Sequence, residues 1–259
     1  MTSTRSAIET TVWEELDKEK RVESREGTKA VDRTKAGRQT TGGTNTRGLA
    51  LIAVFTALYV VASAIPIDAF IGGAGFITVA IILLPVMAKV LRPREAVVMG
   101  AMAALGIYVF QLSVVPILGF FGLLVPSLAI VLGALGFHKS PLIPAAYVLF
   151  GMVWYILFSG GTLVWLAPYV LAVALSIALQ AGALGKGTRL KTFVLVLDAT
   201  MCELVTLNIG SITVLHLPGA LWTVITPFMF LERTVAVMGG SSLLFALAKV
   251  REPLLAERV

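Results

Sequence analysis

The sequence predicts an all-α membrane protein, a polytopic transmembrane helical bundle of about eight spans, with six spans as the alternative. Hydrophobic residues make up 57% of the 259-residue chain and charged residues only 14%, against about 45–50% and about 25% in soluble domains. Of the 21 Lys and Arg residues, 10 lie in residues 1–47, and most of the others lie between apolar segments. This combination is typical of a chain that crosses a lipid bilayer repeatedly.

The composition divides the chain into three parts. Residues 1–47 are rich in both basic and acidic side chains, which predicts a polar cytoplasmic tail without stable structure of its own. Residues 48–250 form the expected transmembrane helical domain, and residues 251–259 form a short cytoplasmic tail. The domain is therefore predicted to carry the function.

The transmembrane domain is a series of apolar segments, each close to the roughly 20 residues that a helix needs to cross a bilayer. Proline and glycine, which stop helices, separate the segments. In chain order the expected spans are 48–66, 76–91, 95–113, 116–136, 141–159, 161–184, 190–213 and 219–248.

Basic residues occur at every second break between these spans. The breaks near 92, 139 and 187 and the segment after 248 contain Lys or Arg, whereas the alternate breaks contain neither. Short basic loops stay on the cytoplasmic side of a membrane. We therefore expect a protein of the cell (plasma) membrane with both termini in the cytoplasm.

Four ionisable residues interrupt the last two apolar segments. A charge at the centre of a span costs roughly 2.5–3.5 kcal/mol on insertion scales, so such groups are normally paired or line a polar cavity. Asp198, Glu232 and Arg233 are predicted to form a buried charge network, with Arg233 paired to Asp198. Asp198 and Glu203 are five positions apart, about 140° around a helix, so they should face different neighbours.

Polar and aromatic residues gather toward the predicted outer ends of the later spans. Glu203 and Asn208 are candidate polar contacts for a substrate, and a set of aromatic side chains could form the walls of an outward-facing pocket. The candidate wall residues are Tyr155, Trp165, Tyr169 and Trp222. A structural alternative remains open for each group. The aromatic residues could instead form a belt at the membrane interface, and the charged residues could form a static network that joins two helices.

Several function classes receive no support from the motifs. Residues 182–188 contain Gly-Lys-Gly in place of the Gly-Lys-Ser/Thr of a phosphate-binding loop, so no ATPase activity is expected in this chain. A single cysteine, Cys202, and two distant histidines predict no metal site and no other cofactor. No catalytic signature is present, and no basic surface with interleaved aromatic residues suggests nucleic-acid binding.

The first span, Leu49-Ala-Leu-Ile-Ala-Val-Phe-Thr-Ala-Leu-Tyr-Val-Val-Ala-Ser-Ala-Ile-Pro66, resembles the first helix of the substrate-binding S components of energy-coupling factor transporters. That family usually has six spans, and its usual Gly-Pro turn between spans two and three is replaced here by Leu91–Glu95. In the family an alanine motif packs on a transmembrane coupling subunit. The resemblance implies that Ala53 and Ala57 would contact such a partner.

The predicted function is capture of a small, vitamin-like molecule by a membrane subunit that depends on a coupling subunit and separate ATPases. The alternative within transport is a proton-coupled secondary carrier that uses Asp198, Glu203 and Glu232. An intramembrane enzyme or a membrane scaffold is the alternative from another class.

Overall fold

The computed structural model describes residues 46–66, 78–110, 118–185 and 187–256. The predicted tails, residues 1–47 and 251–259, lie almost wholly outside the residues whose side chains are described. The described helices are α2 (Thr46–Ser63), α3 (Ala80–Val90), α4 (Pro93–Val109), α5 (Phe120–His138), α6 (Leu142–Phe158), the 3₁₀ helix η3 (Leu163–Leu166), α7 (Ala167–Gln180), α8 (Thr188–Thr213) and α9 (Gly219–Ala256).

The prediction of an all-helical protein is confirmed for the described part of the chain. Each of the eight predicted apolar segments contains one α-helix, because each apolar run ends at Pro, Gly or a polar turn. Four of the described helical segments are long and apolar enough to cross a membrane: Phe120–His138, Leu163–Gln180, Thr188–Thr213 and Gly219–Lys249. Helices α2, α3 and α6 are apolar but shorter.

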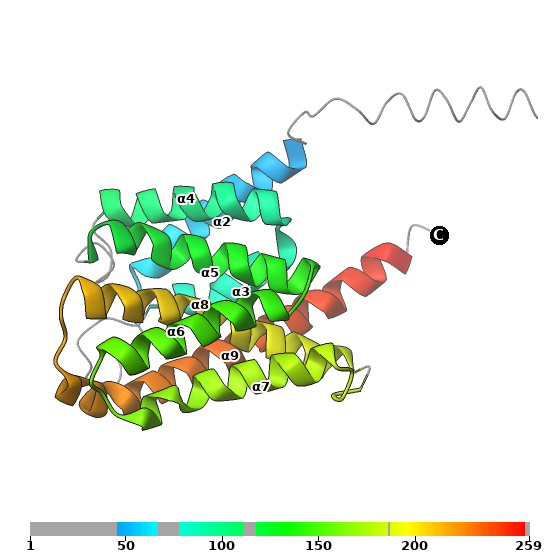
Figure 1. Ribbon diagram of the computed structural model, residues 1–259. Coiled ribbons are helices and arrows are strands. Elements are labelled where there is room, and N and C mark those ends of the chain that lie inside the picture. Colours follow the sequence, from blue (N-terminus) through cyan, green and yellow to red (C-terminus); the bar gives the residue numbers. More distant parts are fainter. Residues whose placement is uncertain (1–45, 67–77, 111–117, 186, 257–259) are drawn as a thin grey trace, which may run out of the picture. The chain divides into compact units, whose positions relative to one another are not determined.

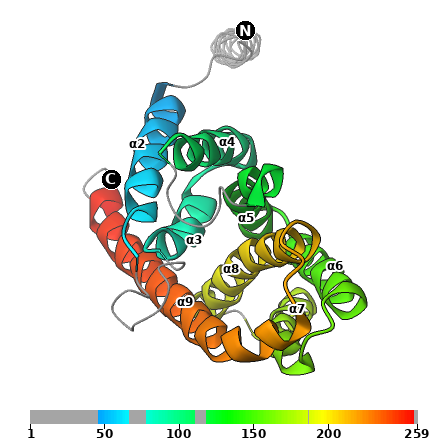
Figure 2. The same ribbon diagram turned by 90° about the vertical axis from the view of Figure 1, so that its left-hand side faces the viewer.

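Helix α8 lies at the centre of the second half of the bundle. In the most apolar 18-residue stretch of α8, 78% is buried inside the bundle. The corresponding stretches of the other three long helices are 33–44% buried. Helix α3 takes the equivalent inner position in the first half. Figure 2 shows α3 and α8 inside a ring formed by the remaining helices.

The outer faces of the ring helices expose large apolar side chains. A soluble protein does not expose so many, whereas lipid is as apolar as these side chains. The chain is therefore a membrane protein. Examples on five helices are Val54, Leu105, Ile156, Leu171 and Val224, each more than half exposed.

A glycine allows three helices to meet where the two halves join. A Cβ atom on Gly133 of α5 would lie 2.9 Å from the Cβ atoms of both Ala88 on α3 and Ala199 on α8. Small residues at such positions let helix backbones approach closely in membranes. The backbones of α3, α5 and α8 thus approach one another closely at this point.

The basic connections lie at one end of the bundle. The Lys89 amine at the end of α3 lies 5.1 Å from the ring centroid of Phe137 at the end of α5. Ser140, in the α5–α6 turn, donates a 3.3 Å hydrogen bond to Gln180 at the end of α7. Figure 1 shows the α3–α4, α5–α6 and α7–α8 connections on the same side as the end of α9. We call this side the basic end.

The opposite end lacks Lys and Arg among the described residues. It consists of residues 64–66, 78–79, 110, 118–119, 159–162 and 214–218. Here Gly160, with φ of 61°, lies against Gly219 at the start of α9. A positive φ is readily adopted by glycine, and the absence of side chains lets the two backbones touch. We call this side the aromatic end, because Tyr155, Trp165 and Trp222 gather there.

Candidate functional site

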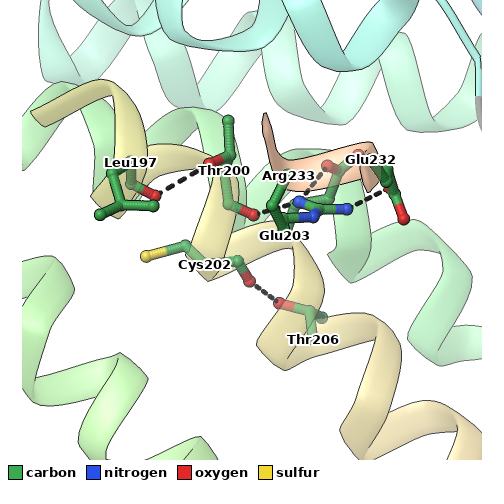
Figure 3. Close-up of polar contacts among 7 residues, drawn as sticks. All are labelled: Leu197, Thr200, Cys202, Glu203, Thr206, Glu232 and Arg233. Carbon is green, nitrogen blue, oxygen red and sulfur yellow. Dashed lines mark hydrogen bonds and ion pairs between the residues drawn. The ribbon is translucent and has the colours of Figure 1, made fainter. Parts of the chain in front are cut away.

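Arg233 connects α9 to α8 inside the bundle. Its Nη1 donates to the carbonyl oxygen of Thr200 at 2.5 Å and to Oε2 of Glu203 at 3.3 Å, and its Nη2 donates to Oε1 of Glu232. Figure 3 shows these groups converging from the two helices. We refer to Thr200, Glu203, Glu232 and Arg233 as the polar cluster.

The predicted pairing of Arg233 with Asp198 is wrong. Asp198 is fully buried and faces α7, where Ser176 donates a 2.6 Å hydrogen bond to its Oδ2. Glu203 takes the place that was predicted for Asp198. The two acidic residues face different helices, as their separation of about 140° around α8 requires, but sequence spacing alone does not say which of them faces α9.

The polar cluster has more acidic than basic groups. Arg233 is 3% exposed, and the side chains of Glu203 and Glu232 are 15% and 16% exposed. One guanidinium therefore faces two carboxyl groups inside the bundle. Buried charges are tolerated only with good partners, so the removal of Arg233 would leave Glu203 without the cation that it contacts.

Three of the predicted wall residues meet at the aromatic end. The rings of Tyr155 and Trp165 are stacked with centroids 6.2 Å apart, and Trp222 approaches them edge-on at 5.4 and 5.1 Å. Each residue is at most 2% exposed, so none of the three lies in a lipid-facing belt. These are distances of rings in direct contact, and the aromatic cluster of Tyr155, Trp165 and Trp222 is closed in this conformation.

The aromatic cluster carries polar groups as well as rings. The Tyr155 hydroxyl donates to the carbonyl oxygen of Thr162 at 3.1 Å, which holds the α6–η3 connection over the cluster. The indole N–H of Trp222 is buried and has no hydrogen-bond partner among the described residues. A buried donor without a partner costs about 1–3 kcal/mol, so a ligand that accepts a hydrogen bond there would remove this cost.

Asn208 and Tyr169 form a contact between α8 and α7. The Asn208 amide donates to the Tyr169 hydroxyl, and both residues are almost completely buried. Tyr169 lies one turn after Trp165, and Asn208 lies between Glu203 and the end of α8 at Thr213. The predicted substrate residues Asn208 and Tyr169 therefore lie between the aromatic cluster and the polar cluster.

The remaining tryptophan of this region has a different position. Trp154 lies on α6 and packs against Phe158 at a centroid distance of 4.6 Å and against Phe150 at 5.9 Å. Both phenylalanines are exposed, whereas Trp154 is half-buried against the hydrophobic core and its indole N–H is buried. Trp154 is thus separate from the ring contacts of the aromatic cluster.

Ala53 and Ala57 are exposed on α2. They lie one helical turn apart, on a face that no described helix covers. This position leaves the predicted partner-binding residues accessible from the membrane.

Two polar residues of the site were not predicted from the sequence. Ser176 and Thr200 each contact an ionisable residue of a buried network, through a hydroxyl and a backbone carbonyl respectively. Serine and threonine are common in membrane helices and often bond to their own helix backbone. A hydroxyl inside a span was therefore too weak a signal to single out Ser176, and the backbone carbonyl oxygen of Thr200 carries no sequence signal because every residue has one.

Among the described residues no group of three or more His, Cys, Asp or Glu side chains could hold a metal ion. The nearest thiol, Cys202, is buried against α6, with its Sγ 3.9 Å from the carbonyl oxygen of Pro144. No protein-family model, curated protein or solved structure matches the chain.

Proposed function

We propose that this protein is a membrane-embedded subunit that captures a small molecule for an ATP-driven importer. The convergence of Tyr155, Trp165 and Trp222 with Asn208 and Tyr169, at the end of the bundle without basic residues, is the observation that carries this proposal. Aromatic surfaces with a few convergent polar groups are typical of small-molecule sites. The resemblance of residues 49–66 to the first helix of S components supports the same function.

The proposed topology has eight spans and places the basic end in the cytoplasm. The grouping of Lys89, Lys139 and the neighbouring connections at one end supports this orientation under the positive-inside rule. The aromatic end would then face the outside of the cell membrane, from which an importer takes its substrate. Both termini would be cytoplasmic.

Substrate would enter by separating the rings of the aromatic cluster. The backbone contact between Gly160 and Gly219 and the Tyr155–Thr162 hydrogen bond close this end, and their release would expose the Trp222 indole. Asn208 and Tyr169 would form the deeper wall. Glu203 lies beyond them in the polar cluster, where it would orient Arg233 and define the floor of the pocket.

The energy would come from partner subunits. The exposed position of Ala53 and Ala57 supports α2 as the surface for a transmembrane coupling subunit, which in turn would bind two ATPases. Recovery of ATPase partners on purification from membranes would support this assembly. Full uptake activity by this chain alone, in vesicles without ATP, would contradict it.

A matched pair of substitutions tests the binding site. Trp222→Phe keeps an apolar ring but removes the buried indole N–H, whereas Trp154→Phe removes a buried indole N–H on α6 that is not part of the aromatic cluster. The purified chain is heated with each member of a panel of water-soluble vitamins and their precursors. A ligand at about 100 times its Kd stabilises the folded state by about 2.7 kcal/mol.

We expect at least one compound to raise the melting temperature of the unsubstituted protein and of Trp154→Phe. The same compound should raise that of Trp222→Phe much less, because a ligand acceptor loses its donor. Equal stabilisation of both variants would contradict binding at the aromatic cluster.

The second candidate, a proton-coupled secondary carrier, is supported by the acidic groups inside the bundle. Asp198 and Glu203 lie on α8 within the bundle, and Glu232 bonds to Arg233 on α9. Such groups are typical of proton pathways in transporters. Uptake that stops when the proton gradient is removed, and continues when ATP is depleted, would favour this candidate.

A further inference from the structure

We infer that Asp198 is a proton-binding site, which holds its proton while α7 packs against α8 and releases it when the two helices separate. Asp198 is fully buried in the middle of α8. Its Oδ2 accepts a hydrogen bond from Ser176 Oγ at 2.6 Å, and its buried Oδ1 has no hydrogen-bond partner among the described residues. One neutral hydroxyl is thus the whole polar environment that the structure gives this carboxyl group.

No cation compensates Asp198 in the part of the chain that the structure describes. Arg233 is engaged by Thr200, Glu203 and Glu232 on the opposite side of α8. The buried thiol of Cys202 lies one turn along α8 from Asp198. Among the residues whose side chains the structure describes, the other titratable or charged groups on the helices that pack against α8 are Lys89 of α3, His138 of α5, Tyr147 and Tyr155 of α6, Tyr169 of α7, and Glu232, Arg233 and Lys249 of α9.

The distribution of these groups leaves protonation as the means of neutralising Asp198. Lys89, His138 and Lys249 belong to the basic end, Tyr155 belongs to the aromatic cluster, and Tyr147 bonds to Thr206 at 2.9 Å. An ionised carboxylate in an apolar interior costs several kcal/mol unless it is paired and fully hydrogen-bonded. A carboxylic acid avoids that cost, and its remaining hydrogen-bonding demand is smaller than that of a carboxylate.

The position of Asp198 connects this proton to the state of the aromatic cluster. Helix α7 contacts α8 through two polar pairs, Tyr169–Asn208 toward the aromatic end and Ser176–Asp198 deeper in the bundle. Trp165 lies in η3, which runs directly into α7. Movement of Trp165 away from Trp222 would therefore carry α7 with it and expose Asp198 to water.

Water would favour the ionised form, so the closed conformation binds the proton and the open conformation releases it. By linkage, removal of the proton must favour the open conformation to the same extent. The protonation of Asp198 does not depend on the proposed importer function, and it holds for a secondary carrier equally.

Selective labelling can observe this proton directly. The chain contains four aspartates, and the other three are Asp17, Asp32 and Asp68. We propose to label aspartate side-chain carboxyl groups with ¹³C and to record solid-state NMR spectra of the protein in lipid vesicles at neutral pH. Asp198→Asn assigns the Asp198 signal by its loss.

We expect the Asp198 signal at the chemical shift of a protonated carboxylic acid. In Ser176→Ala, which retains Asp198 but removes its hydrogen-bond partner, the signal should shift and remain in the protonated range. Because Ser176→Ala keeps the labelled group, the assignment can be made even if Asp198→Asn does not fold. A signal in the carboxylate range at neutral pH would overturn the inference.

A cysteine on α7 tests whether loss of the Asp198 proton is linked to separation of α7 from α8. Ala172 is fully buried one turn from Ser176, and Ala172→Cys in a Cys202→Ala background reports exposure of this face to a membrane-permeant thiol reagent. The reaction should accelerate several-fold more on raising the pH when Asp198 is present than in the matched Asp198→Asn protein. Identical pH dependence in the two proteins would overturn the coupling between the proton and helix separation.

Discussion

Arg233 donates hydrogen bonds to acceptors on two helices while only 3% of the residue is exposed. Its presence in the core was predictable from the sequence, because it lies within an apolar segment. Its partners were not predictable, since they depend on how α8 and α9 are rotated about their axes. At the residue scale, composition identifies which groups are buried, and packing determines how they pair.

Replacing Arg233 should destabilise the bundle strongly. In Arg233→Gln, Glu203 and Glu232 lose the guanidinium group that donates to both of them. Removing one partner of a buried ion pair costs about 3–5 kcal/mol. We expect a lower melting temperature in detergent than that of the unsubstituted protein.

The triple variant Arg233→Gln/Glu203→Gln/Glu232→Gln provides the control, because it removes the acidic groups as well. It should recover most of the lost stability. If Arg233→Gln melts at the same temperature as the unsubstituted protein, the polar cluster is not held together by charge.

At the scale of helices, apolar runs and their Pro and Gly boundaries were sufficient to predict the eight segments in which the described α-helices occur. Their lengths were less predictable. The segment 76–91 was expected to span the membrane, but α3 has 11 residues, or about 16 Å at 1.5 Å per residue. That is about half of the roughly 30 Å hydrocarbon core, so the number of crossings depends on more than the number of helices.

Helix α9, in contrast, is longer than the predicted span 219–248. It has 38 residues, about 57 Å in length, and Figure 1 shows its C-terminal part extending past the other helices at the basic end. Hydropathy locates the apolar part of such a helix. It does not indicate where a helix continues into water, because polar residues are equally compatible with a helix or a tail there.

The close approach of α3 and α8 to Gly133 of α5 predicts that a larger residue at this position destabilises the bundle. In Gly133→Ala the added methyl group would meet Ala88 and Ala199 at 2.9 Å, and overpacking of this kind typically costs about 1–3 kcal/mol. The melting temperature should fall accordingly. Gly187→Ala is the matched control, because a Cβ there meets nothing within 4 Å; equal effects of the two changes would show that the α3–α5–α8 contact does not limit stability.

At the scale of the whole molecule, the two ends of the bundle differ in charge and in chemistry. Alternation of basic and non-basic breaks predicted that they would differ, and the structure brings the basic breaks together at one end. The aromatic cluster was predictable only as a set of residues near the opposite end. Direct ring contact between Trp165 and Trp222 depends on the close approach of α9 to the α6–η3 connection, which no local pattern specifies.

The orientation of these ends in the membrane is the claim on which the proposed function depends most directly. Native Cys202 is fully buried and provides little background for thiol labelling. Single cysteines are introduced as Lys139→Cys at the basic end and Thr162→Cys at the aromatic end. Both sites lie in connections between helices, where a cysteine should be tolerated.

Intact cells are treated with a membrane-impermeant maleimide before and after permeabilisation. We expect the Thr162→Cys protein to be labelled in intact cells and the Lys139→Cys protein to be labelled only after permeabilisation. Labelling of both proteins from the same side, or the opposite assignment, would contradict an outward-facing aromatic end and with it the proposed capture of substrate from outside the cell.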